Sequence, residues 1–107
     1  MRRVVVTGLG LLTSIGDGVN KTWNNLINGK SGIKKIKTFD TEDLSCKIAG
    51  YISHDPKDPY FYDRSIDLEI KDIKRNDRFI QYGIAAAKMA VVDSGIVASD
   101  WRDDFAF

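Results

Sequence analysis

The chain has 107 residues, 43% hydrophobic and 29% charged, which is typical of a soluble globular domain or part of one. A formal net charge of +1 gives no bulk signal for nucleic acid or an anionic membrane. No segment approaches the ~20 apolar residues of a membrane-spanning helix, and the one cysteine, Cys46, excludes an intrachain disulfide. We therefore expect a cytoplasmic chain without a nucleic-acid or membrane partner.

The N-terminal part of the chain predicts the opening of an α/β fold. Residues 3–7 contain three consecutive valines, which favour a strand buried on both faces, as in a parallel sheet. Residues 11–18 are a turn-rich connection, and residues 19–28 have the apolar spacing of a one-sided helix. Gly29 is a natural stop for this helix.

The middle of the chain is less regular. Residues 30–46 predict an irregular segment whose four lysines near its start are typical of a solvated loop. Residues 47–52 favour a short strand, and residues 54–63 a proline-marked loop. Residues 66–75 predict a helix with three isoleucines on one face: Ile66, Ile70 and Ile73.

The strongest prediction is a single long helix between Asp77 as N-cap and Gly95 as C-terminal stop. Its apolar residues form two stripes, and only Gln81 and Lys88 share a polar line. One stripe contains Phe79, Tyr82, Gly83, Ala86 and Ala90, and the other contains Ile80, Ile84, Ala87 and Val91. This pattern favours a helix buried in the middle layer of a fold over an ordinary amphipathic one. Gly83 and the alanines keep the helix thin, so that neighbouring backbones can approach closely.

Gly8-Leu9-Gly10, directly after the valine run, suggests a dinucleotide-binding turn. However, Thr13 occupies the place of the third glycine, the next helix begins too late, and no acidic residue ends a second strand about 20 residues on. Glycines of a tight turn explain the sequence equally well. A piece of a dinucleotide-binding oxidoreductase stays an alternative.

Neither Cys46 nor His54 has the surroundings of a catalytic residue. Cys46 has no helix start behind it and only His54 as a candidate base, so a small buried hydrophobe is the favoured role. His54 lies in the proline-flanked loop and is interpreted as a polar surface residue. Zinc-ligand spacing and paired carboxylates are absent from the sequence, so we expect no catalytic residue, cofactor site or metal site.

Three basic residues precede the long helix. Lys71, Lys74 and Arg75 are spaced at i, i+3 and i+4 and can project to one side of a helix. Such a cluster is usually a solvated face, and its alternative role is to attract an acidic partner.

Several blocks of the sequence resemble a known family in order. They are the segments 2–10, 22–23, 31–33, 39–40, 49–50 and 77–95. Together they resemble the opening of β-ketoacyl-acyl-carrier-protein synthase II, an acyltransferase of fatty-acid biosynthesis and lipid metabolism. The resemblance implies a partial thiolase-like α/β fold, the N-terminal part of one half of an α-β-α-β-α arrangement, with residues 77–95 as its middle helix. The family's nucleophilic cysteine and two histidines match no residue here.

The resemblance also implies partners. Lys71, Lys74 and Arg75 match positions at which the family docks acidic acyl carrier protein, and the parent enzymes are homodimers. The loop at residues 54–65 is longer than usual, and the end of the chain departs from the family. We therefore expect residues 1–107 to be an incomplete N-terminal portion of a synthase domain, with residues 96–107 a non-native or truncated tail. Such a fragment is expected to be inactive alone, or to bind carrier protein or a separately encoded remainder of the synthase.

Overall fold

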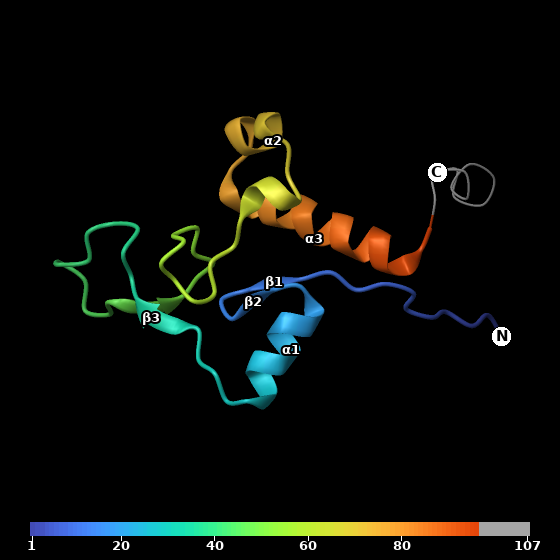
Figure 1. The fold of residues 1–107 in the computed structure, drawn as a ribbon, viewed down its shortest axis with the longest axis horizontal. Helices are drawn as coiled ribbons and strands as arrows, with labels where there is room; N and C mark the ends of the chain where they lie inside the picture. The colour runs from blue at the N-terminus through green and yellow to red at the C-terminus, as the bar shows by residue number, and fades with distance from the viewer. Residues whose placement is uncertain (97–107) are drawn as a thin grey trace.

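The computed structural model describes residues 1–96, which form a small mixed helix-and-sheet unit measuring 55 × 35 × 25 Å (Figure 1). The predicted tail lies outside the described residues except for Ile96. The elements in chain order are β1 (Leu12–Thr13), β2 (Gly16–Asp17), α1 (Val19–Ile27), β3 (Ile33–Lys35), β4 (Ile48–Gly50), the 3-10 helix η1 (Arg64–Ile66), α2 (Ile70–Arg75) and α3 (Arg78–Ser94). None of the helices within residues 1–96 is both long and apolar enough to cross a membrane.

The predicted first helix is confirmed as α1. The connection before it is a tight β1–β2 hairpin, in which Leu12 pairs with Asp17. Gly18 follows the hairpin at a φ of 99°, a conformation that glycine adopts without strain. The side-chain amide of Asn25 donates to the carbonyl of Ile15 at 2.5 Å and holds α1 against the hairpin.

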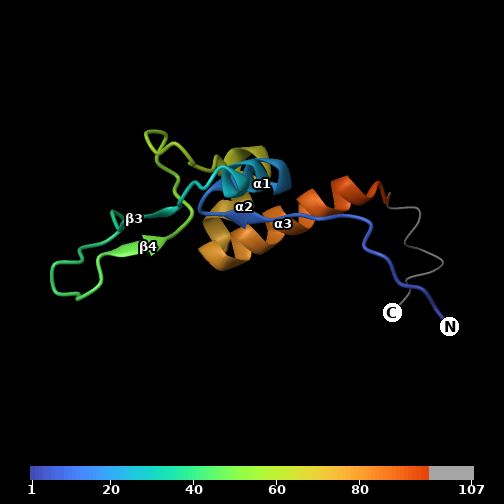
Figure 2. The ribbon, with the colours of Figure 1, turned by 90° about the horizontal axis from the view of Figure 1, so that it is seen from below.

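The predicted buried strand at residues 3–7 is wrong for the described residues. This segment forms no ladder, and its valines face solvent, with Val4 95% exposed. A strand buried on both faces needs neighbouring strands for its N–H and C=O groups and layers over both faces. Residues 1–96 supply only α3, beside which the N-terminal segment runs (Figures 1 and 2).

A second hairpin projects from the far end of the molecule (Figure 2). The predicted strand at residues 47–52 is confirmed as β4, which pairs antiparallel with β3 in the register Lys34↔Ala49. The expectation of an irregular segment at residues 30–46 missed β3. The strand β3 has only three residues, and it is held by its pairing with β4. The hydroxyl of Tyr51 also donates to the carbonyl of Lys35 at 3.2 Å.

The predicted helix at residues 66–75 is interrupted. Of its first four residues only Ile66 is helical, as the last residue of the 3-10 helix η1, which Asp63 begins by accepting the backbone N–H of Ser65 at 3.0 Å. Glu69 then takes an extended conformation with ψ at 155°, so that α2 starts only at Ile70. The break allows Leu68 to turn inward. It packs with Tyr62 and Ala85 in the small core, against which four partly buried residues pack: Leu12, Ile52, Ile73 and Ile84.

The long helix is confirmed as α3, and Gly95 ends it in the left-handed conformation at a φ of 74°. Asp77 is the N-cap by position, but its carboxylate makes no capping bond, which corrects that detail. The carbonyl of Asp77 accepts the N–H of Gln81 at 3.0 Å instead.

The predicted burial of α3 on both sides does not hold within residues 1–96. Ala85 is fully buried, whereas Phe79 is 74% and Val92 80% exposed. Gln81, on the predicted polar line, is among the most buried residues, because its amide donates to the carbonyls of Ile73 and Asn76 at 3.1 and 2.8 Å. This polar side chain therefore fastens the turn between α2 and α3, and much of the helix's apolar surface stays open.

Candidate functional site

Gly8 lies against the end of α3 and Gly10 against its middle. A Cβ atom on Gly10 would overlap the carbonyl oxygen of Ala86 and lie 2.6 Å from the nitrogen of Ala90. Between the glycines, the N–H of Leu9 donates to the carboxylate of Asp93 at 2.9 Å. The glycines thus permit a close backbone approach to the thin part of α3. This packing explains Gly8-Leu9-Gly10 without a phosphate ligand.

Cys46 is exposed, which corrects its expected burial. Its thiol donates to the carbonyl of Ile48 at 3.3 Å, and no histidine accompanies it. His54 is turned to other partners. Within residues 1–96 no group of three or more metal-ligating side chains gathers. The described residues therefore bring together neither a nucleophile with a base nor a metal site.

His54 is a half-buried structural residue, which corrects the interpretation of a polar surface side chain. Its Nδ1 lies 2.9 Å from the carbonyl oxygen of Tyr62, and its Nε2 lies 2.7 Å from the hydroxyl of Tyr82. These contacts fit a neutral ring that donates from Nδ1 and accepts at Nε2. Burial lowers the pKa of His54, and the positive charges of Arg64 and Arg78 lower it further, against the opposing hydrogen bond to Tyr62.

The pKa of His54 can be measured directly, because it is the only histidine in the chain. An NMR titration of its ring is expected to give a midpoint below the ordinary value of about 6.5. Since the unfolded chain takes up the proton first as the pH falls, the contribution of this group to stability is complete above about pH 6.5 and decreases below it.

Two comparisons check this titration. Replacing Arg78→Gln removes a nearby positive charge and should raise the midpoint, and full denaturant should return it to about 6.5. A midpoint at or above the denatured value in the folded chain would show that His54 is not held neutral by its surroundings.

The basic residues predicted before the long helix lie on α2, and all three are exposed: Lys71, Lys74 and Arg75 (the α2 basic cluster). Ile73 on the same helix packs against the core, so the cationic side chains are left to the solvent side. Within residues 1–96 the only ion pair of the cluster joins Lys71 to Glu69 at 3.4 Å, and both side chains are two-thirds exposed. Such an exposed pair contributes little, so the cluster is available to an acidic partner.

A second open surface lies on α3. Part of the second apolar stripe lines a hollow of about 820 Å³ with Ile66 of η1. The walls also include Ile84, Ala87, Val91 and Val92. The sequence signalled this surface correctly as an apolar stripe, although the described residues leave it uncovered.

Comparison with known proteins identifies the chain. Residues 1–105 match the family described as β-ketoacyl synthase, N-terminal domain. The chain belongs to the β-ketoacyl synthase family. It is 40% identical over 99 residues to 3-oxoacyl-[acyl-carrier-protein] synthase 2 of Vibrio cholerae and 43% identical over 95 residues to that of Vibrio harveyi. The match to the Synechocystis synthase 2 is 36% over 103 residues.

These alignments cover 92%, 89% and 96% of this β-ketoacyl synthase chain but only 22%, 21% and 23% of the relatives. A solved structure described as "The ishigamide ketosynthase/chain length factor" is similar with a TM-score of 0.69 at 34% identity, over 92% of this chain and 23% of the other. The resemblance to β-ketoacyl-acyl-carrier-protein synthase II and the expected partial thiolase-like α/β fold are therefore confirmed.

Proposed function

We propose that the chain is the N-terminal portion of a β-ketoacyl-acyl-carrier-protein synthase II and that its α2 basic cluster docks the acidic carrier protein. The parent reaction is decarboxylative condensation of acyl and malonyl groups on that carrier, in the cytoplasmic synthesis of fatty acids. The names and identities of the relatives support this assignment. In the described residues Cys46 and His54 are bonded to separate partners, which supports binding as the chain's proposed contribution.

The observation that carries the docking proposal is the exposure of the α2 basic cluster. Lys74 and Arg75 make no ion pair with any other residue of the range 1–96, and α2 lies at the edge of the molecule away from the β3–β4 hairpin (Figure 1). Positive charge placed in this way steers an acidic partner into contact and fixes its orientation. Its effect decreases as salt screens the charges.

Charge reversal of the α2 basic cluster to glutamate is expected to weaken binding of acyl carrier protein at low salt by about tenfold or more. The loss should become smaller as ionic strength rises, because screening reduces attraction in the parent and repulsion in the variant alike. Isothermal titration calorimetry or biolayer interferometry over a salt series measures both effects.

The matched control reverses three exposed cations elsewhere, Arg3, Lys30 and Lys47, and so changes the net charge equally. It should affect carrier binding much less. Unchanged affinity in the α2 variant, or equal losses in both variants, would refute docking at this helix.

A second candidate function is engagement of a separately encoded remainder of the synthase, in a family whose parent enzymes are homodimers. The exposed valines of residues 4–6 and the apolar hollow on α3 favour it. We do not favour the oxidoreductase alternative, because the close packing of Gly8 and Gly10 on α3 accounts for these glycines without a bound dinucleotide.

A further inference from the structure

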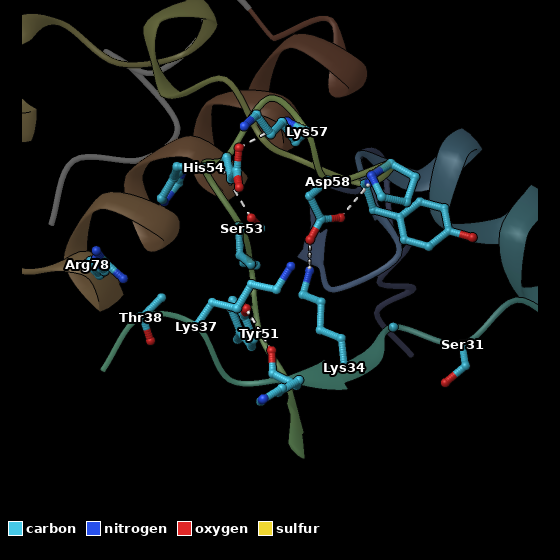
Figure 3. Close-up of a pocket in the computed structure, with 16 residues that line it drawn as sticks. Ser31, Lys34, Lys37, Thr38, Tyr51, Ser53, His54, Lys57, Asp58 and Arg78 are labelled. Atoms are coloured by element: carbon cyan, nitrogen blue, oxygen red, sulfur yellow. Dashed lines mark hydrogen bonds and ion pairs between the residues drawn. The ribbon is translucent and has the colours of Figure 1, made fainter. Parts of the chain in front are cut away.

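A cavity of about 610 Å³ lies between the β3–β4 hairpin and the loop at residues 53–60 (Figure 3). Arg78 at the start of α3 and Ser31 before β3 mark its two ends in this view. Part of the cavity wall comes from lysines of residues 30–37, a segment whose sequence predicts a solvated loop. The structure adds what the sequence did not show, which is that three separate segments bring cations around one space.

The cavity carries more positive charge than the chain as a whole. Five of its lining residues are lysine or arginine and two are aspartate, an excess of three positive charges against a formal +1 for all 107 residues. One lysine is neutralised, because Lys34 pairs with Asp58 at 2.6 Å. The ammonium of Lys34 also lies 4.6 Å from the centre of the Tyr51 ring, which fixes this pair as part of the wall.

The remaining cations are available to a ligand. Four cations remain, and none of them forms an ion pair with another residue in the described part of the chain: Lys35, Lys37, Lys57 and Arg78. Lys37 extends across the cavity toward the Lys34–Asp58 pair, so its ammonium is directed inward (Figure 3). Like charges brought together around a hollow repel one another, and a bound anion relieves that repulsion.

We propose that this cavity binds a small phosphate-bearing molecule, whose phosphate groups contact Lys37, Lys57 and Arg78. Its volume lies within the range of small-molecule sites, about 300–1,000 Å³, and therefore exceeds what a single phosphate needs. Tyr60 and Pro59 add apolar wall for an organic body. The site shares no residue with the α2 basic cluster, so the two proposals fail independently.

The test is a titration of the 107-residue chain with inorganic pyrophosphate and, separately, with ADP, followed by 15N NMR. Saturable amide shifts are expected at residues 34–38 and 53–58 with at least one probe at millimolar concentration or below. Tighter binding of ADP would assign a role to the organic body, and equal binding would assign the affinity to the phosphates; both results support the site. The double variant Lys37→Gln, Lys57→Gln should weaken binding about tenfold or more, through the loss of charge-assisted hydrogen bonds.

The matched control is Lys30→Gln, Lys47→Gln, which removes the same charge from two exposed residues outside both the cavity and the α2 basic cluster. It should leave the affinity for either probe within about twofold, since these residues lie outside the cavity. The proposal is overturned if neither probe gives saturable shifts at millimolar concentration. It is also overturned if the cavity variant and the control variant lose affinity equally, because binding would then follow net charge alone.

Discussion

The purified 107-residue chain is expected to form no 3-oxoacyl product when mixed with acyl- and malonyl-carrier protein. Covalent catalysis needs a nucleophile with an activating base or an environment that lowers its pKa. The chain has one cysteine, which is exposed and bonded to the carbonyl of Ile48, and one histidine, which is held by Tyr62 and Tyr82. Product formation should therefore equal that of a blank without protein.

The control for this assay is Cys46→Ala, which should behave as the parent chain does. If the chain forms product above the blank and Cys46→Ala does not, the thiol of Cys46 takes part in the reaction. That result would contradict the proposal that the chain contributes only binding. Mass spectrometry of the carrier protein detects the product without a coupled enzyme.

A methyl group at Gly10 is expected to detach the N-terminal segment from α3. In Gly10→Ala the new Cβ overlaps the carbonyl of Ala86, a backbone atom that cannot move aside without bending the helix. Overpacking of this kind costs about 1–3 kcal/mol. The urea midpoint of the helical circular-dichroism signal should fall, and the N–H of Leu9 should lose its protection from hydrogen exchange.

Gly83→Ala is the matched control, with the opposite sign. Gly83 is exposed inside α3, and a Cβ there meets no atom within 4 Å. Alanine in a helix interior is more stable than glycine by about 0.5–1 kcal/mol, so the midpoint should rise. A midpoint for Gly10→Ala equal to or above the parent value would show that the close approach does not exist in solution.

Local patterns predicted α1 and α3 well. The apolar spacing of residues 19–28 and the flanking glycines located α1, and Asp77 and Gly95 bounded α3 to within one residue at each end. The α2 basic cluster could also be placed, because exposed cations on a short helix follow from their spacing. These features depend on residues within a few positions of one another, which sequence periodicity reports directly.

The errors concern features that depend on distant partners. The valines of residues 3–7 predict a buried strand, but burial requires neighbours that residues 1–96 do not supply. The sequence pattern places Gln81 on a polar line, but its side chain is buried because it bonds to the carbonyls of Ile73 and Asn76 before α3. Lys37, Lys57 and Arg78 line one cavity (Figure 3), but their spacing in the sequence gives no sign that they lie near one another.

We propose that α3 and the valines of residues 4–6 are interior surfaces of a complete synthase, and that the described residues 1–96 leave them uncovered. Fully burying one large apolar side chain contributes about 1.5–3 kcal/mol. Val4, Val6, Phe79 and Val92 are all exposed. The loss of such burials is comparable to the about 5–15 kcal/mol of net stability in a typical domain.

Differential scanning calorimetry of the dilute chain, with its association state checked by analytical ultracentrifugation, tests this claim most directly. We predict a broad unfolding transition of low enthalpy for the monomer. A sharp cooperative transition, with the full enthalpy expected for about 100 residues, ~60–80 kcal/mol, would show that the chain completes its own core and would contradict the claim.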